Sequence, residues 1–203
     1  MESLDNIPIP YPQGILRHLL RAPLLGYKLG LGGLLDMIFV MVLVTRGRKS
    51  GKPRYTPIEY RRHGSKIYVV SAWGSRPQWY QNIMANPVVT VQLGLRAYDA
   101  SARVVDNPAE ALRALYLFRR IAPARYDAVM RRLIKDDSVN ARTLPDLSHQ
   151  FTIVCLDITS QQPNLPVLAA SLAWVWLLIP LAIAGAVVAL LANRSRREMT
   201  PDR

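Results

Sequence analysis

The sequence predicts an α+β protein: an antiparallel β-barrel with a helical insertion, followed by a C-terminal transmembrane helix. Two consecutive hairpin patterns, in which short apolar strands are separated by turn residues, precede two helical segments and a closing strand. Residues 167–192 then form a stretch without an ionisable group. About 20 apolar residues cross a hydrocarbon core about 30 Å thick, so this stretch is long enough to span a bilayer.

Residues 1–36 are predicted to form an N-terminal segment outside the barrel. Leucines mixed with basic residues over 15–27 are typical of an amphipathic helix that lies on a membrane surface, although Pro23 interrupts the pattern. The apolar run 29–44 has two interpretations, a second membrane span or a loop followed by a buried strand. Asp36, the glycines and the β-branched residues near the end of the run favour the loop and strand.

The barrel domain is predicted over residues 37–159, and it contains two hairpins with glycine in each turn. Their strands are 55–62 with 65–72, around His63-Gly64, and 88–93 with 96–105, around Gly94-Leu95. Each hairpin brings two short strands together in an antiparallel pair, as a barrel of this kind requires.

A helical insertion follows the hairpins. Asn107 is suited to cap a helix whose first residue is Pro108 and whose third is Glu110. This helix is expected to run through 111–121. A second helix over 124–135 and a closing strand over 150–158 complete the domain.

The net charge of +12 favours anionic partners, which include lipid headgroups, a phosphorylated cofactor and nucleic acid. Aromatic residues are not interleaved with the basic ones, which argues against nucleic acid. The single cysteine, Cys155, excludes an internal disulfide and fits a buried strand residue in a reducing compartment. His18, His63 and His149 are too scattered for a metal site, so none is expected.

Residues 45–54, Thr-Arg-Gly-Arg-Lys-Ser-Gly-Lys-Pro-Arg, form a basic turn between two expected strands. Gly47 and Gly51 let the backbone turn tightly, and the Arg, Lys and Ser donors around them can converge on phosphate or carboxylate oxygens. The segment does not match a phosphate-binding P-loop, because Pro53 follows Gly51-Lys52 and no helix begins there. A solvated turn without a ligand fits the composition equally well.

Residues 71–87 form a second motif, in which a strand end opens onto a Gly/Ser/Pro loop and a short helix begins near Pro77. The free N–H groups of a helix start bind acceptors, and aromatic residues beside them suit a planar ring with polar edges. By periodicity alone, Trp79, Ile83 and Met84 are better explained as core residues.

In order and separation, residues 43–54 and 79–87 resemble the deazaflavin-dependent nitroreductase family. Members of this family are small split-β-barrel proteins that use coenzyme F420, and some reduce quinones or nitroaromatic compounds. The resemblance covers residues 40–105, with a looser match through the closing strand. It implies that the predicted barrel is a split barrel.

The resemblance also implies the site residues. On the basic turn, the residues that would hold the anionic phosphate and glutamate tail of the coenzyme are Arg48, Lys49, Ser50 and Arg54. At the strand end, the residues that would lie beside the deazaflavin ring are Val70, Ser71, Ala72 and Trp73. At the helix start, the residues that would contact the ring and its side chain are Gln78, Trp79, Tyr80, Gln81 and Asn82. Tyr126 matches an aromatic on the substrate side and is the expected catalytic residue, with Tyr116 nearby and unassigned. The chain departs from the best-known member at Trp73, where that enzyme has lysine, and at Glu59, where it has an aromatic residue.

The implied activity is hydride transfer from reduced F420 to a quinone or nitroaromatic acceptor, with protonation from a hydroxyl group or water. A cofactor carries such chemistry, so no catalytic triad is expected. Two alternatives stay open. A related split barrel can hold FMN or haem in place of F420, and a non-enzymatic domain can act as a basic adaptor at an anionic membrane.

At the C-terminal end, a linker over 160–166 is predicted to lead into the membrane helix, and a basic tail over 193–203 follows it. The positive-inside rule places that tail in the cytoplasm, whereas a cytosolic coenzyme requires the barrel to be there. A tail that crosses despite the rule, a second span over 29–44 and a monotopic segment remain possible topologies. We expect a single-pass protein of the cell membrane with a cytoplasmic domain and a membrane quinone such as menaquinone as substrate.

Overall fold

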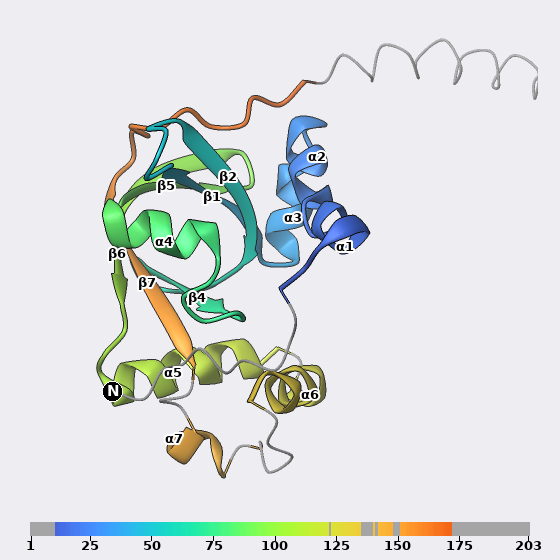
Figure 1. Cartoon of the computed structure of the whole chain (residues 1–203), viewed down its shortest axis with the longest axis vertical. Coiled ribbons are helices and arrows are strands. Elements are labelled where there is room, and N and C mark those ends of the chain that lie inside the picture. The colour runs from blue at the N-terminus through green and yellow to red at the C-terminus, as the bar shows by residue number, and fades with distance from the viewer. Residues whose placement is uncertain (1–10, 122, 135–139, 141, 148–150, 172–203) are drawn as a thin grey trace, which may run out of the picture.

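The computed structural model describes residues 11–121, 123–134, 140, 142–147 and 151–171. Seven antiparallel strands form one curled sheet in the order β2-β1-β5-β6-β7-β4-β3 (Figure 1). The strands are β1 Val40–Arg46, β2 Pro53–Glu59, β3 Arg61–His63, β4 Lys66–Ser71, β5 Val88–Leu93, β6 Arg96–Val104 and β7 Thr152–Ser160. The predicted antiparallel sheet with a helical insertion is therefore confirmed.

The two strands at the ends of this order, β2 and β3, are separated in the chain by Tyr60 alone. β2 pairs with β1, and β3 pairs with β4, so one stretch of chain links both edges of the sheet and closes the curl. Within the described sheet β2 and β4 form no ladder with each other. A gap therefore lies between these two strands, and it is where the cavities described below are found.

The residues of β1 explain why run 29–44 is apolar without spanning a membrane. Met41 and Leu43 pack inside the barrel, while Val42 and Val44 pack on the other face of the strand with Tyr27. A strand buried on both faces reads as continuous hydrophobic sequence. The buried strand is confirmed, although its approach is helical: α3 covers Gly32–Met37.

The prediction of one helix over 15–27 is wrong in one respect, because the structure has two helices there, α1 Gly14–Leu19 and α2 Ala22–Lys28. Pro23 lies in the first turn of α2, where the missing N–H costs nothing, and so it begins a helix instead of interrupting one. The Tyr27 hydroxyl holds this segment to the barrel by donating to the Val40 carbonyl (2.9 Å).

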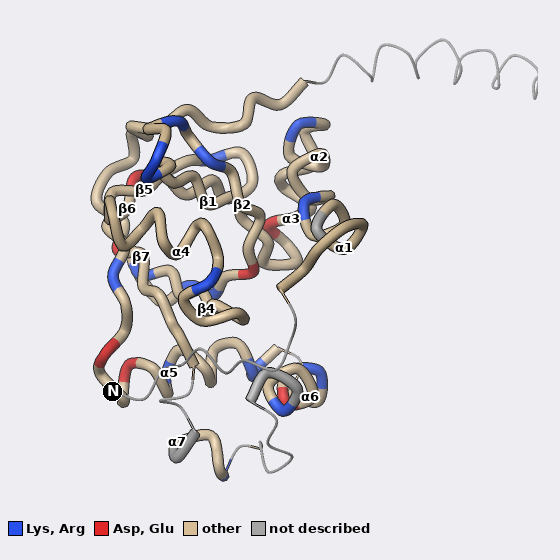
Figure 2. The backbone as a smooth tube through the Cα atoms, in the orientation of Figure 1, with Lys and Arg blue, Asp and Glu red and all other residues tan. Residues whose placement is uncertain are grey.

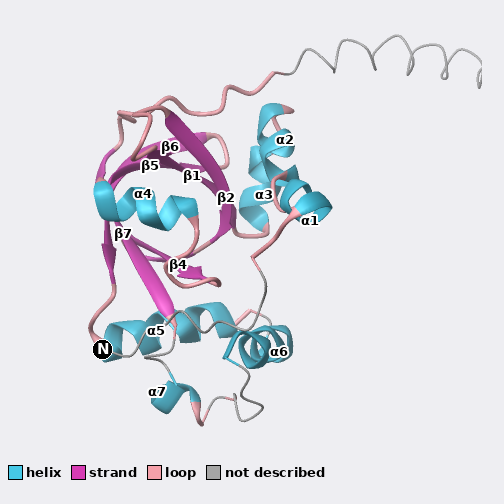
Figure 3. Cartoon of the chain, viewed as in Figure 1, coloured by secondary structure: helices cyan, strands magenta, loops and turns pink. Residues whose placement is uncertain are grey.

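Four further helices lie in the part of the chain that the structure describes: α4 Gln78–Ala85, α5 Pro108–Arg119, α6 Pro123–Ile134 and the short α7 Leu144–Leu147, which the sequence did not indicate. Helix α4 lies across the barrel, and α5, α6 and α7 lie together on one side of it (Figure 3). Trp79 and Ile83 of α4 belong to the core inside the barrel, whereas α5 and α6 bury Phe118 and Tyr126 against the outer side of β4 and β7. Asn107 caps α5 as predicted, since its side chain accepts hydrogen bonds from the N–H groups of residues 109 and 110.

The hairpin over 88–105 has its predicted turn. The first predicted hairpin is wrong in its first strand: of residues 55–62, only 61 and 62 pair with β4, because residues up to 59 belong to β2 and pair with β1. The turn of this hairpin is also displaced by one residue. His63 is the last residue of β3, and the turn consists of Gly64 and Ser65. Gly64 has φ +63°, a conformation that glycine adopts without strain, and this requirement sets the position of the turn. Cys155 is a fully buried residue of β7, as expected, and burial raises the pKa of its thiol to about 11.

The segment after β7 lies along the barrel. The N–H of Leu168 donates to the Gln92 side chain (3.0 Å), and the N–H of Ser171 donates to the carbonyl of Lys28 on α2 (2.7 Å). Residues 167–171 are not helical, so the predicted helix does not begin at 167. Residues 172–192 and the basic tail lie outside the described residues. Among the helices that are described, none has both the length and the apolar character needed to cross a membrane.

A half-buried carboxylate, that of Glu110, joins α5 to the sheet. Glu110 accepts hydrogen bonds from Arg103 (2.6 Å), Tyr68 (2.9 Å) and Lys66 (3.3 Å). The Arg103 guanidinium lowers the pKa of Glu110 from 4.5 to about 2, against the opposing effect of burial. This carboxylate is therefore ionised in the folded protein at every ordinary pH.

We predict that Glu110→Gln lowers the free energy of unfolding at pH 7 by about 2 kcal/mol, a typical value for hydrogen bonds to a charged group. Because the pKa is lower in the folded state, the stabilisation is present above pH 4.5 and is lost as the pH falls toward 2. Urea unfolding at pH 7 and pH 3 measures both effects. Asp106→Asn, an exposed change nearby, is the control, and an equal loss at both pH values for Glu110→Gln would contradict the assignment.

Candidate functional site

Two adjoining cavities lie in the gap between β2 and β4, and they share a wall made of Ile58, Val70 and Ala72. The first, which we call the α4 cavity, has a volume of about 500 Å³ and lies between β2, the start of α4 and residues 11–21. The second, the α6 cavity, has a volume of about 610 Å³ and lies between β2, β3 and the helices α5 and α6.

The basic turn is a tight, rigid loop at the end of β1. Gly47 N–H donates to the carbonyl of Lys52 (2.9 Å), and Gly51, with φ +67°, donates to the carbonyl of Gly47 (2.7 Å). A side chain at position 47 would come within 3.0 Å of the Ser50 hydroxyl and 3.2 Å of the Lys52 carbonyl, so the loop leaves little room for one. The predicted tail-binding residues, Arg48, Lys49, Ser50 and Arg54, are all exposed. Figure 2 shows the Lys and Arg positions of this loop in blue, between β1 and β2.

The structure joins the basic turn to the start of α4, although the two motifs are far apart in the sequence. The N–H of Arg48 donates to Asn82 Oδ1 (3.1 Å), and the Arg48 guanidinium donates to the side chain of Gln78 (2.9 Å). Asn82 is only 4% exposed and donates to the buried hydroxyl of Thr45 (3.0 Å). Asn82 therefore positions the turn from beneath, and Gln78 lies at the surface where a ligand can reach it.

The strand-end residues divide by role. Val70, Ala72 and Trp73 line the α4 cavity. Ser71 does not line it, because its buried hydroxyl donates to the carbonyl of Gly74 (2.6 Å). The Trp73 ring packs edge-to-face on Tyr11, with 5.8 Å between ring centres, so the N-terminal segment forms part of the cavity wall.

The residues of α4 also differ in role: some line the α4 cavity and others support the loop or the core. Trp79 lines the α4 cavity and is at the same time part of the barrel core, and Tyr80 packs on it edge-to-face at 6.0 Å. The side chain of Gln81 donates to the carbonyl of Ser75 (3.3 Å) and supports the loop before the helix. The core interpretation holds for Ile83, but it is wrong for Met84, which is 60% exposed.

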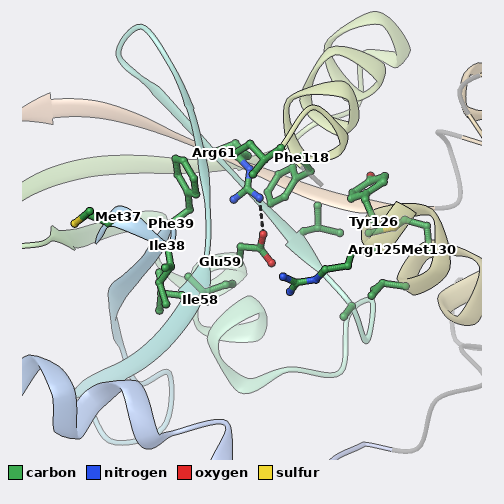
Figure 4. Close-up of a pocket in the computed structure, with 15 residues that line it drawn as sticks. Met37, Ile38, Phe39, Ile58, Glu59, Arg61, Phe118, Arg125, Tyr126 and Met130 are labelled. Atoms are coloured by element: carbon green, nitrogen blue, oxygen red, sulfur yellow. Dashed lines mark hydrogen bonds and ion pairs between the residues drawn. The ribbon is translucent and has the colours of Figure 1, made fainter. Parts of the chain in front are cut away.

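Tyr126 lies in the α6 cavity and not in the α4 cavity (Figure 4). It is 8% exposed, and its hydroxyl has no hydrogen-bond partner among the described residues. Burial, followed by the charges of Asp127 and Glu59, raises its pKa, so the hydroxyl keeps its proton and can act as a donor at neutral pH. Tyr116 belongs to neither of the two described cavities.

Sequence reasoning missed Arg61, one of the two arginines that line the α6 cavity. Its guanidinium lies between the rings of Phe39 (4.7 Å) and Phe118 (4.8 Å) and forms an ion pair with Glu59 (2.6 Å). Phe39 has φ +60°, which is rare for a large residue, and this conformation holds its ring over Arg61. The signal in the sequence was Arg61-Arg62, because adjacent residues of a strand face opposite sides and one of them must point inward.

The sequence is similar to proteins of one known family. The model of the F420H(2)-dependent quinone reductase family matches residues 26–135. The F420H(2)-dependent quinone reductase Rv1261c of Mycobacterium tuberculosis is 34% identical over 69 residues, which are 32% of this chain and 46% of that protein. The putative F420H(2)-dependent quinone reductase Rv3178 of the same organism is 37% identical over 83 residues, covering 35% of this chain and 70% of that protein.

The chain thus spans about half the length of the Rv1261c protein. Among solved structures, an F420-H2 dependent reductase (FDR-A) is 27% identical and has a TM-score of 0.42, covering 58% of this chain and 93% of that one. The match of the family model includes the basic turn, α4 and both walls of the gap between β2 and β4.

We predict that Asn82→Ala lowers the free energy of unfolding by about 2 kcal/mol, because it leaves the Thr45 hydroxyl and the Arg48 N–H without their partner. Chemical denaturation followed by tryptophan fluorescence measures the change. Asn86→Ala, which removes an exposed hydrogen bond to the N–H of Val88, is the matched control and should cost much less. Equal losses in the two variants would show that Asn82 does not hold the turn.

Proposed function

The chain belongs to the F420H(2)-dependent quinone reductase family, and on that premise we propose that it is an oxidoreductase that uses reduced coenzyme F420 to reduce a quinone-type acceptor. The observation that carries the proposal is the attachment of an exposed basic turn to the mouth of a cavity through Arg48, Gln78 and Asn82. This arrangement provides cations for an anionic tail next to an enclosed space for a ring.

The residues fit the coenzyme. Arg48, Lys49, Ser50 and Arg54 would hold its phosphate and glutamate tail, because their donors surround one rigid loop and form charge-assisted hydrogen bonds. The α4 cavity, with Trp73 and Trp79 in its walls, would enclose the deazaflavin ring. FMN, which also has a phosphate and a planar ring, is the alternative ligand of the same residues.

The acceptor would enter through the α6 cavity, which adjoins the α4 cavity at the shared lining residues Ile58, Val70 and Ala72, and it would meet the ring there, because a hydride passes only between groups in contact. When bound, reduced F420 supplies a hydride, and the protein contributes orientation and electrostatics. Tyr126, which keeps its proton at neutral pH, is the donor available on the acceptor side. The mostly apolar lining suits a planar quinone or nitroaromatic ring.

We predict that Lys49→Ala with Arg54→Ala weakens F420 binding about 10-fold to 100-fold, the loss that corresponds to about 1.4–2.8 kcal/mol. Quenching of F420 fluorescence on titration with the full chain measures the dissociation constant. Arg96→Ala with Arg113→Ala removes the same charge from exposed positions on β6 and α5 and is the control.

Loss of affinity in both double variants would indicate a general charge effect and reject the tail site. Tight binding of FMN without binding of F420 would move the protein to the flavin alternative, and a Soret band in the purified protein would indicate haem. If no chromophore binds, the basic adaptor becomes the leading interpretation. Reduction of a soluble quinone by F420H2 tests the activity itself.

We also propose that the protein acts at the cell membrane as a single-pass protein with a cytoplasmic domain. The apolar run after residue 171 begins beside α2, where the Ser171 N–H donates to the Lys28 carbonyl. Large apolar side chains on the N-terminal helices are exposed, namely Ile15, Leu16, Leu19, Leu25, Leu34 and Met37. Leu20 lines the α4 cavity and Met37 the α6 cavity, so a bilayer at this face would bring lipid-soluble quinones to the site.

Expressed at low level, the full chain is predicted to sediment with membranes and to stay there after an alkaline carbonate wash, because a spanning helix resists extraction that removes peripheral proteins. Immunoblotting of the washed pellet measures this. Protease added to intact spheroplasts should leave the barrel uncut. Complete extraction by carbonate would rule out the span, and external cleavage of the barrel would place the domain outside.

A further inference from the structure

The α6 cavity combines apolar walls with an excess of positive charge. Phe39, Phe118 and Met130 contribute rings and a thioether to its lining, while its charged groups are two cations, Arg61 and Arg125, and one carboxylate, Glu59. Figure 4 shows the Arg125 side chain extending toward Glu59 from the α6 side. A neutral apolar ring alone would not need these groups, so the cavity has capacity for a ligand with a negative oxygen.

Arg61 is held in place independently of Glu59. Its side chain lies between the rings of Phe39 and Phe118, and its Nη1 donates to the carbonyl of Tyr60 (2.7 Å). Only 7% of the residue is exposed, and its Nε is buried without a partner among the described residues. A buried guanidinium with an unsatisfied N–H is costly, which means that Arg61 can gain from a further acceptor.

Glu59 is the exposed half of the pair. Its side chain is 60% exposed, and its Oε1 lies 2.6 Å from Nη2 of Arg61. Because this carboxylate is already mostly hydrated, it can turn into water with little change in its own solvation, and Arg61 then keeps its ring contacts and its bond to the Tyr60 carbonyl. The Nε and one terminal nitrogen of a guanidinium form the fork that receives a carboxylate or similar oxyanion with two hydrogen bonds. Glu59 Oε1 therefore marks a position for a ligand oxygen.

We propose that Arg61 is a specificity-determining residue of the α6 cavity: it binds an anionic oxygen of an aromatic acceptor in the position that Glu59 occupies, and Glu59 is a built-in competitor for that position. The inference rests on the proposed function, in which this cavity holds the acceptor. An acceptor that takes up a hydride gains one negative charge, until a proton from water neutralises it. The Arg61 cation favours that charged form through direct contact and through its field in a poorly solvated cavity.

The test compares two ligands of the same ring system, 1,4-naphthoquinone-2-sulfonate and neutral 1,4-naphthoquinone, by calorimetric titration of the full chain without coenzyme. Glu59→Gln removes the competitor and is expected to tighten sulfonate binding about 3-fold to 10-fold. Arg61→Met removes the cation and is expected to weaken it about 10-fold or more, while Arg61→Lys retains part of the affinity. Binding of the neutral quinone should change less than about 2-fold in each variant.

Arg62→Met is the matched control, since Arg62 is exposed next to Arg61 and donates to the carbonyl of Gly64. Opposite changes for Glu59→Gln and Arg61→Met, with Arg62→Met unchanged, support the proposal. Sulfonate binding that weakens in Glu59→Gln, or that is unchanged in Arg61→Met, overturns it. If Arg61→Met does not fold, Glu59→Gln decides by itself, because it alters only an exposed side chain.

F420 titration of the same variants separates this inference from the proposed function. If no variant binds F420 but sulfonate binding still depends on Arg61, the proposal that the protein uses F420 is rejected and the proposal of an anion site at Arg61 stands. If F420 binds normally but neither substitution changes the affinity for the sulfonate, the anion site is rejected and the proposed use of F420 stands.

Discussion

The structure depends on one stretch of chain, residues 53–63, that forms both edge strands of the sheet, β2 and β3. Tyr60 lies between the end of β2 and the start of β3. Two hydrogen bonds hold it in place: its N–H donates to the carbonyl of Phe39 (2.9 Å), and its hydroxyl donates to Asp36 (2.5 Å). Burial, together with the hydrogen bond to Asp36, raises the Tyr60 pKa, so that hydroxyl remains a donor. Because the strand changes partner at this residue, β2 separates from β4, and the separation creates the space for both cavities.

The same change of partner explains where the charges lie. Glu59 and Arg61 flank Tyr60 and have the two-residue spacing that places side chains on one face of a strand, and both line the α6 cavity. At the other end of β2, the basic turn leaves the sheet and is held by Asn82 of α4. A single hairpin, β1 with β2, therefore carries the cations of the basic turn at one end and part of the wall of the α6 cavity at the other. The distribution of charge follows from the path of one strand.

The N-terminal helices pack against the barrel on one side and expose apolar residues on the other. Tyr27 anchors them, because its hydroxyl bonds to the carbonyls of Val40 and Gln92, and burial raises its pKa to about 12. A side chain at Gly32 would come within 2.7 Å of the Gly94 carbonyl, so the helices approach the β5–β6 hairpin as closely as glycine permits. With its inner side fixed in this way, the N-terminal segment exposes several leucines to solvent, and two of its exposed apolar residues, Leu20 and Met37, line the α4 and α6 cavities respectively.

The sequence by itself determined what depends on neighbouring residues: the hairpin at Gly94-Leu95, the Asn107 cap, the buried strand of 40–44 and the basic turn, whose donors and glycines are local. It also determined the family, through two motifs in a fixed order. Only the tertiary structure decided that Asn82 lies beneath the turn, that Ser71 faces its own loop, that Tyr126 belongs to a second cavity and that Arg61 points inward between Phe39 and Phe118. Apart from the local hydrogen bond of Ser71 to Gly74, those features join residues that are 20 or more positions apart. No periodicity along the chain encodes such contacts. They arise when the barrel closes and the free energy of packing selects which side chains are buried together.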